Sequence, residues 1–391
     1  MKRFLLVHYG EIGLKGSNAR YFLDKLQMRM EEKLRARFGK GFKIIHTLRR
    51  FLISLPESFE ESQFTDVLNH IAGIQNFKFV YEGALDFAQL GTQILGHLPV
   101  QRGETFRVKV KRSMEMERTS VASEREIGAV LLRGGIEMKP KMSGADLIVD
   151  VEFFNNIGYF SFKTYKGMGG LSSGSGSKLV ALISAGIDSP VAAYRMMKRG
   201  VRVVFVHFHS YPYTGKEEME QVKSLVKILS GFQFDTKLYL IPFGDLQKKI
   251  ATTVEIPEAI RTVLYRRMML RIAQRVSFRE EARGLVTGDS YGQVASQTAD
   301  NLFAIHDISN IPLYQPLIAY DKEEIIKISK EIGTFEVSKL PCKDSCTLFA
   351  PEKPEVKASL KKIAEYESYL QVDELVDDAF KRRDVLTEVS D

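Results

Sequence analysis

The stretch 179–194, LVALISAGIDSPVAAY, limits the fold of this chain more than any other part of its sequence. Its apolar run Leu179–Ile183 predicts a buried strand, and the following Ser184-Ala185-Gly186 predicts a tight loop. Asp188-Ser189-Pro190 predicts a helix start, with the first two residues as candidate N-caps and the proline in the first turn. Free N–H groups at such a strand–loop–helix junction suit a phosphate. The spacing matches neither Walker A nor GxGxxG, so a plain turn without a ligand stays open.

Apolar runs and helical patterns alternate through the chain after this stretch. The alternation predicts a doubly wound parallel sheet with helices on both faces, in which ligands bind beyond the carboxyl ends of the strands. His207 and Phe208 end the second predicted strand and are candidates for holding a base. A metal site at His207 and His209 stays open, although no cysteine or carboxylate spacing supports it. Arg266 or Arg267, on a predicted helix, is a candidate phosphate ligand or a solvated surface residue.

Positive charge is concentrated at the N-terminus of the 391-residue chain, whose formal net charge is +7. Residues 1–56 carry 13 Lys and Arg against 4 Asp and Glu, whereas residues 178–391 carry 30 of each kind. A basic region joined to a neutral one indicates a polyanionic partner, most simply nucleic acid, and a solvated charged surface is the alternative. The length indicates two or three domains.

The N-terminal region 1–56 has a β-α-β pattern, with a glycine-rich loop between its first strand and its helix. Lys15 and Arg20 make this loop cationic at a helix N-terminus, which suits a phosphodiester group. A connector with incidental cations is the alternative. The next region, 57–166, is mixed α+β and contains the alternating strand 105–112. Its apolar residues share one face, and Arg107, Lys109 and Lys111 lie on the other. The cations of this strand either bind RNA or form an ordinary solvated surface: Arg107, Lys109, Lys111 and Arg112.

The Gly/Ser-rich segment 167–178 predicts a flexible linker, which could also fold over a nucleotide. No apolar stretch predicts a signal peptide or a membrane span, and we expect a cytoplasmic protein. The two cysteines, Cys342 and Cys346, cannot form a disulfide framework or, without a second pair, a structural zinc site. Inert buried thiols are the default for them, but their polar, Pro-flanked loop lowers that expectation. The last segment, 351–391, predicts a helical appendage without chemistry.

Several motifs carry a resemblance to known families. Ser184–Ser189 resembles the SGGxDS signature of PP-loop ATP pyrophosphatases, with Ala185 where these proteins usually have a glycine. Tyr9–Gly16, YGEIGLKG, resembles the opening of the ThiI family of tRNA sulfurtransferases. Thr287–Thr298 resembles that family's TGDSLGQVASQT stretch, and Cys346-Thr347 matches the position of its sulfur-transfer cysteine. The order of the motifs also agrees over the whole chain.

The resemblance implies a fold of α/β and α+β domains: a ferredoxin-like domain (1–56), a THUMP RNA-binding domain (57–166), the linker (167–178) and a PP-loop domain (179–391). Asp188 would lie near a magnesium ion and the pyrophosphate leaving group. Asp289 is a second candidate, either for binding that ion or for positioning uridine. Arg107, Lys109, Lys111, Arg112, Lys15 and Arg20 would contact tRNA. The ATP site implied by the resemblance comprises Leu182, Ile183, Ser184, Gly186, Asp188, Ser189, His207, Phe208, Arg266, Gly288 and Gln297.

The implied activity is ATP-dependent synthesis of 4-thiouridine at position 8 of tRNA. ATP would adenylate O4 of the uridine, and sulfur from a cysteine desulfurase would replace that oxygen, with Cys346 as carrier and Cys342 as a resolving thiol. Because the sequence ends at Asp391, we expect a form without the rhodanese domain that many members carry. A homodimer and a role in thiazole synthesis are family-level expectations. The alternatives are another PP-loop tRNA-modifying synthetase, and a tRNA-binding protein whose nucleotide site is inactive because of Ala185.

Overall fold

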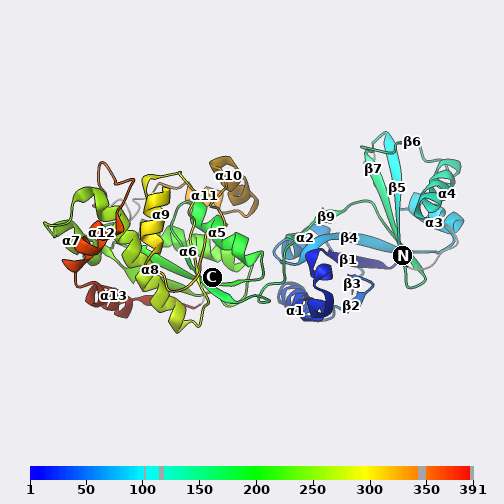
Figure 1. Ribbon diagram of the computed structural model, residues 1–391. Helices are drawn as coiled ribbons and strands as arrows, with labels where there is room; N and C mark the ends of the chain where they lie inside the picture. Colours follow the sequence, from blue (N-terminus) through cyan, green and yellow to red (C-terminus); the bar gives the residue numbers. More distant parts are fainter. Residues whose placement is uncertain (101–102, 114–118, 342–348, 388–391) are drawn as a thin grey trace. The chain divides into compact units, whose positions relative to one another are not determined.

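The computed structural model describes the chain except for residues 101–102, 114–118, 342–348 and 388–391. It divides into two compact units, Met1–Ser172 (unit 1) and Ser173–Asp391 (unit 2) (Figure 1). Unit 1 is α+β and unit 2 is a doubly wound α/β domain, so the fold class expected from the sequence is confirmed. Among the described residues, no helix is long and apolar enough to cross a membrane.

The first half of unit 1 packs two helices on one face of an antiparallel sheet. Strand β1 lies between β3 and β4, and β2 pairs with β3 at the edge. Leu26, Met30 and Phe64 of the helices pack against Val7 and Phe77 of the strands. The elements are β1 (Arg3–Tyr9), α1 (Ala19–Phe38), β2 (Ile44–Thr47), β3 (Arg50–Ser54), α2 (Glu61–Leu68) and β4 (Ile74–Gly83).

The second half of unit 1 continues the same sheet, because β4 pairs with β8 as well as with β1. The strand order is β2-β3-β1-β4-β8-β7-β5-β6, with β9 also beside β4. The division of unit 1 at residue 56 stays a prediction. The further elements are α3 (Phe87–Leu95), β5 (Thr105–Arg112), α4 (Ser120–Arg133), β6 (Lys139–Pro140), β7 (Leu147–Phe154), β8 (Ile157–Ser161) and β9 (Tyr165–Lys166).

Strand β5 has the alternation that its sequence predicts. Phe106, Val108 and Val110 are buried in the core under α3 and α4, whereas Lys111 on the opposite face is exposed. Period-two alternation places successive side chains on opposite faces of a sheet. The sequence therefore predicted correctly which face of β5 packs.

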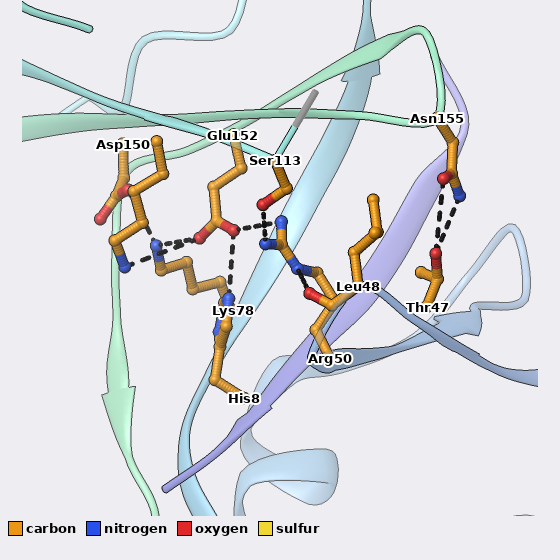
Figure 2. Close-up of polar contacts among 10 residues, drawn as sticks. His8, Thr47, Leu48, Arg50, Lys78, Ser113, Asp150, Glu152 and Asn155 are labelled. Atoms are coloured by element: carbon orange, nitrogen blue, oxygen red, sulfur yellow. Dashed lines mark hydrogen bonds and ion pairs between the residues drawn. The ribbon is translucent and has the colours of Figure 1, made fainter. Parts of the chain in front are cut away.

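A cluster of charged side chains links β1, β3, β4 and β7 (Figure 2). Arg50 and Lys78 alternate with Phe51 and Phe77, which pack in the core under α1 and α2, so the two cations lie on the opposite face of the sheet. The carboxylate of Glu152, on β7, is 2.9 Å from Arg50 Nη1, 2.9 Å from Lys78 Nζ and 3.1 Å from His8 Nε2. Lys78 also lies 2.8 Å from Asp150. Burial alone would raise the pKa of Glu152, but the contacts with His8 and Lys78 outweigh it and hold that pKa well below its usual range.

The glycine-rich segment 167–178 joins the two units and is hydrogen-bonded at both ends. The Gly169 N–H donates to Ile74 O at 2.6 Å, and the Ser172 hydroxyl donates to Phe22 O at 2.8 Å. Gly174 N–H and Gly176 N–H each donate to Gly200 O at 3.0 Å. These bonds attach Gly169 and Ser172 to unit 1, and Gly174 and Gly176 to unit 2. The roles of the segment as linker and nucleotide cover stay predictions.

Unit 2 is built on a sheet of order β14-β13-β10-β11-β12-β15, parallel except for the antiparallel edge strand β15. The chain passes from β10 to β11 and β12 on one side, and β13 then pairs with the other side of β10. The strand order thus reverses at β10, and ligands bind at such a switch point. The strands are β10 (Lys178–Leu182), β11 (Arg202–His209), β12 (Leu238–Pro242), β13 (Leu285–Val286), β14 (Leu313–Tyr314) and β15 (Asp384–Leu386).

The helices of unit 2 cover both faces of this sheet (Figure 1). The C-terminal segment was expected to be a helical appendage. Its helices α12 and α13 agree with this, but β15 also adds a strand to the edge of the sheet, and Ile363 of α12 enters the core. The helices are α5 (Asp188–Met197), α6 (Glu217–Ser230), α7 (Gly244–Thr252), α8 (Arg261–Arg279), α9 (Ala299–His306), α10 (Lys322–Glu331), α11 (Phe335–Ser338), α12 (Leu360–Ser368) and α13 (Val372–Lys381).

We expect Glu152→Gln to lower the free energy of unfolding by about 3–5 kcal/mol, because it leaves the buried Arg50 without a carboxylate and Lys78 with Asp150 alone. Urea denaturation followed by circular dichroism measures this change. The exposed Glu137→Gln is the matched control and should change the stability by no more than about 0.5 kcal/mol.

The pH dependence has a defined sign. Since the folded-state pKa of Glu152 is lowered, its contribution to stability is present above the unfolded-state pKa of about 4.3 and is lost as the pH falls toward the folded-state value. The stability difference between wild type and Glu152→Gln should therefore shrink below about pH 4. A difference that grows on acidification would contradict this assignment.

Candidate active site

The loop between β10 and α5 is closed by its own serines. The Ser184 N–H donates to Ser189 Oγ at 2.9 Å, and the two hydroxyl oxygens lie 3.1 Å apart. Helix α5 begins at Asp188 and has no side-chain cap, so the prediction that Asp188 or Ser189 caps it is wrong. Pro190 lies in the first turn, as expected. The first N–H groups of α5 are therefore not engaged by a capping side chain, which suits an anion.

Ala185, the residue that departs from the PP-loop signature, is compatible with the loop. It is 5% exposed and is not among the non-glycine residues with positive φ. A glycine is needed only where φ is positive or where a methyl group has no room. The backbone at this position therefore does not require glycine.

Gly288 brings the loop after β13 against the start of α5. A Cβ atom at this position would lie 2.8 Å from Ser189 N and 3.0 Å from Asp188 C, closer than atoms of this kind can approach. The sequence predicted that this glycine allows close approach to a nucleotide. The structure supplies a different reason, which is the contact between two segments of the protein backbone.

A cavity of about 310 Å³ lies at the switch point, between the ends of β10 and β13. Of the residues assigned to ATP from the sequence, only Gly186 is not in its lining. Glu218, Thr262, Tyr265, Met269, Thr287, Asp289, Val294 and Ser296 complete the wall. The assigned residues in the lining are Leu182, Ile183, Ser184, Asp188, Ser189, His207, Phe208, Arg266, Gly288 and Gln297.

Two buried acceptor atoms in this lining have no hydrogen-bond partner within the described residues. His207 Nδ1 lies 3.1 Å from Ile183 O, so this nitrogen carries the proton and Nε2 is left as a free acceptor. Burial lowers the pKa of His207 to about 4, which keeps the ring neutral. Gln297 Oε1 is likewise buried and unpaired. Buried polar atoms are normally hydrogen-bonded, so both favour a ligand that carries amino or hydroxyl groups.

Asp289 is a buried carboxylate whose oxygens are fully engaged. It accepts from Arg266 at 2.5 Å, Thr287 at 2.7 Å and Gln315 at 3.1 Å. Burial would raise the pKa of Asp289, but Arg266 and these hydrogen bonds outweigh it, and the pKa lies below its usual value. Arg266 thus lies in the wall of the cavity as expected, with its charge balanced by Asp289. Its neighbour Arg267 is buried and pairs with Glu367, so its interpretation as a phosphate ligand or a solvated surface residue is wrong.

Asp188 lies at the start of α5. Two residues that the sequence analysis did not identify contact it. Lys322 Nζ lies 2.6 Å from Asp188 Oδ1, and Gln293 Nε2 donates to Oδ2 at 2.9 Å. The Lys322 side chain remains 43% exposed. Lys322 begins α10, and nothing in the local pattern there points to a partner in a segment so distant in sequence. This arrangement holds a lysine ammonium group beside the N-terminus of α5, where phosphate charge is favoured.

Within the described residues, no group of three or more His, Cys, Asp and Glu side chains could hold a metal ion. Among the described residues, His207 and His209 therefore belong to no such group.

Comparison with known proteins gives this site a family. A family model described as "Thiamine biosynthesis protein (ThiI)" matches residues 174–372, and one for the ThiI ferredoxin-like domain matches residues 4–77. The "Probable tRNA sulfurtransferase" of Thermus thermophilus is 38% identical, over 99% of this chain and 94% of its own length. The chain belongs to the ThiI family. A relative of the same description from Lysinibacillus sphaericus is 37% identical, over 97% of this chain and 94% of its own.

A solved structure has the same fold as this ThiI family member. It is described as the crystal structure of a 4-thiouridine synthetase–RNA complex with bound ATP, and it is 32% identical with a TM-score of 0.86. The likeness covers 99% of each chain. The resemblance drawn from the motifs is thereby confirmed, together with the fold class that it implies.

The cations assigned to tRNA in this family member all lie in unit 1. Lys15 lies within the glycine-rich loop, which forms two short 3-10 turns and buries Ile12, and Arg20 lies just after it in α1. Lys15 lies over the Phe22 ring, and the Arg20 side chain is 88% exposed. Of those on β5, Arg107 donates to Met142 O, Arg112 donates to the Ser120 hydroxyl, and Lys109 and Lys111 are at least partly exposed. Their contacts with RNA stay predictions.

Cys342 and Cys346 lie outside the described residues, but the chain just before them is held against the candidate active site. The Ser338 hydroxyl donates to Gly186 O at 3.3 Å. Gln221, on α6, donates to Val337 O at 2.6 Å and to Leu340 O at 3.4 Å. The segment that leads into the cysteines therefore starts beside the loop Ser184–Ser189.

We expect Gly288→Ala to weaken ATP binding about 10–100-fold, because the added methyl group displaces the loop from α5 and misplaces the groups around the cavity. Isothermal titration calorimetry with ATP measures this, and overpacking should also cost about 1–3 kcal/mol of stability. The control is Gly128→Ala on α4, where no atom lies within 4 Å of the added Cβ. Wild-type ATP affinity in Gly288→Ala would show that the backbone contact does not shape the site.

Proposed function

We propose that this protein is an ATP-dependent tRNA sulfurtransferase that makes 4-thiouridine. The observation that carries the proposal is the cavity at the switch point, which combines the uncapped start of α5 with two unpaired buried acceptors. A nucleoside triphosphate matches both features, because its phosphates are anionic and its base and ribose carry donors. The relatives named tRNA sulfurtransferase and the solved complex with RNA and ATP support the same function.

The residues in the cavity wall suggest the orientation of ATP. His207 Nε2 and Gln297 Oε1 are acceptors for the adenine amino group or a ribose hydroxyl group. The triphosphate would lie at the start of α5, where Lys322 adds a positive charge. Because Arg266 neutralises Asp289, that carboxylate does not repel the phosphates.

Magnesium belongs to this proposal, and the donor groups fit it in one way. Mg²⁺ commonly binds through one or two carboxylates together with phosphate oxygens and water. Asp188 is a carboxylate in the cavity wall that is only partly buried, and its partners Lys322 and Gln293 are side chains that can move. Asp188 would hold the ion together with the phosphates, and the ion would neutralise charge on the departing pyrophosphate.

The chemistry begins when O4 of the uridine at tRNA position 8 attacks the α-phosphorus of ATP. The bond from that phosphorus to the β-phosphate oxygen breaks, and pyrophosphate leaves. C4 then carries AMP as its leaving group. A sulfur nucleophile attacks C4, the C4–O4 bond breaks, and AMP departs with the original oxygen.

We assign the sulfur to a persulfide on Cys346, supplied by a cysteine desulfurase. The terminal sulfur would attack C4, which leaves a disulfide between Cys346 and the base. The Cys342 thiolate would then attack the Cys346 sulfur, releasing 4-thiouridine and forming a Cys342–Cys346 disulfide that a dithiol reductant reopens. The anchoring of Ser338 and Leu340 beside the loop Ser184–Ser189 supports delivery of sulfur to this site.

Two further features belong to the proposal. The description of the matching family as a thiamine biosynthesis protein favours a second use of the persulfide, in making the thiazole ring. A two-fold homodimer is the assembly that we expect, because such dimers are the commonest soluble oligomers. Light scattering of the purified protein tests this expectation.

The decisive measurement is mass analysis of unmodified tRNA after incubation with the protein, ATP, magnesium, a cysteine desulfurase and cysteine. We expect a sulfur-for-oxygen mass gain that maps to uridine 8 and requires ATP. tRNA-stimulated ATP–pyrophosphate exchange without thiolation would favour another PP-loop synthetase. Absence of both activities would favour a tRNA-binding protein with an inactive nucleotide site.

The roles of the cysteines are tested separately. We expect Cys346→Ser to abolish thiolation while leaving ATP–pyrophosphate exchange near the wild-type rate, because adenylation precedes sulfur transfer. Cys342→Ser should allow one attack but block release, which mass analysis of the protein detects as a covalent protein–tRNA adduct. Full thiolation by Cys346→Ser would refute the carrier role.

A further inference from the structure

The tip of the β2–β3 hairpin in unit 1 has a backbone conformation that its residues do not favour. Thr47 pairs with Arg50, so Leu48 and Arg49 form a two-residue loop, and their φ angles are 40° and 67°. Positive φ at both positions defines a type I′ turn, which strongly prefers Asn-Gly or similar pairs. A leucine and an arginine here lower the stability of the turn, because the Cβ atom is crowded in the left-handed region.

The neighbouring β7–β8 hairpin provides a comparison within the same unit. Phe154 pairs with Ile157, and the two-residue loop between them is Asn155-Asn156, with φ angles of 51° and 59°. Asparagine tolerates this region far better than leucine or arginine. Two turns of one type thus carry favourable residues in one hairpin and unfavourable residues in the other. Unfavourable backbone conformations of this kind cluster at functional sites.

Burial does not compensate for the unfavourable turn. Leu48 is 46% exposed and Arg49 is exposed, so neither side chain gains a core position. The backbone around them is nevertheless held firmly (Figure 2). Thr47 Oγ1 and Asn155 hydrogen-bond across the two hairpin tips at 3.2 Å, and Arg50 Nε donates to Leu48 O at 3.2 Å. The turn is therefore braced while its two side chains stay free to contact something else.

The buried charge cluster determines which cation is exposed here. Arg50 is 6% exposed and gives its guanidinium to Glu152 and to the Ser113 hydroxyl. Arg49, the next residue toward the tip, is exposed and forms no hydrogen bond or ion pair within the described part of unit 1. Arg50 serves as the internal anchor, and Arg49 is left as the external cation.

Residues next to the tip contact residues that adjoin both groups of cations assigned to tRNA from the sequence. First, Tyr9 leads into the loop that carries Lys15, and the Tyr9 hydroxyl lies 3.0 Å from His46 Nε2. Burial raises the pKa of Tyr9, and the nearby charge of Arg49 partly offsets this. Second, Ser113 directly follows Arg112 and accepts a hydrogen bond from Arg50. The tip is therefore close, through these contacts, to the chain on either side of the two groups.

We infer that the Leu48-Arg49 tip is an RNA-backbone contact, in which Arg49 binds a phosphate and joins the glycine-rich loop and the basic strand β5 into one continuous track. The inference rests on the proposed function, because it needs tRNA as the partner. The chain retains a leucine and an arginine in an unfavourable turn because an Asn-Gly turn would remove the cation. Arginine suits this role, since its planar guanidinium binds phosphate oxygens in pairs.

The charge is tested with Arg49→Ala in the full-length protein, with an unmodified tRNA transcript and fluorescence anisotropy over a range of KCl concentrations. One lost phosphate contact should lower the slope of log affinity against log salt by about 0.9, and the affinity at about 0.1 M salt by roughly eight-fold. The control Arg125→Ala removes an exposed arginine from α4 and should change the affinity less than about two-fold. Equal losses in both variants, or no loss in Arg49→Ala, would overturn the inference.

The turn is tested with Leu48→Asn/Arg49→Gly, which installs the favoured pair. We expect a melting temperature at or above that of the wild type together with weaker tRNA binding, because a merely structural tip would not lose affinity as it gains stability. Wild-type affinity, or a lower melting temperature, would refute the inference. Failure of the unchanged protein to bind tRNA would instead refute the proposed function, so the two failures are distinguishable.

Discussion

The contact between the loop after β13 and the first turn of α5 is the constraint on which unit 2 depends. Parallel pairing of β10 with β13 puts the ends of both strands at one edge, and Gly288 lets the two backbones touch there. This contact brings together two of the segments that line the cavity. The loop after Gly288 supplies Asp289, Gln293 and Gln297, and the turn of α5 supplies Asp188. Because no single element carries all the polar side chains of the site, the segments that carry them must approach each other closely, as they do at Gly288.

In unit 1 the corresponding constraint is electrostatic. Burying Glu152 alone would be costly, and burying Arg50 or Lys78 alone would be equally so. Their mutual contacts make the burial tolerable and tie β7 to β3 and β4. The same arrangement separates two adjacent arginines by function, since Arg50 is used inside and Arg49 stays outside. A structural ion cluster can therefore define a binding surface without itself contacting the ligand.

Much of the candidate site could be predicted from the sequence because it depends on local order. The strand–loop–helix at 179–194 and the alternation in β5 follow from periodicity and turn chemistry, and both are confirmed. The N-cap prediction failed because Ser189 bonds back to Ser184 instead of to its own helix. Arg267 was predicted to bind phosphate or to be solvated, but it is buried and paired with the carboxylate of Glu367. That residue lies on a helix 100 residues later in the chain. Nothing in the vicinity of Arg267 announces that partner.

Local sequence patterns were enough to predict most of the helices and strands, the order of the motifs and the family, because each of these depends on residues close together in the chain. Only the tertiary structure decided which polar groups meet. Asp188 and Lys322 are 134 positions apart, and their contact exists because α5 and α10 pack against one another. Likewise, only the structure shows that His207 Nε2 and Gln297 Oε1 are buried without a hydrogen-bond partner among the described residues. Local periodicity fixes the face on which a side chain lies, but the partner across that face depends on how the whole chain closes on itself.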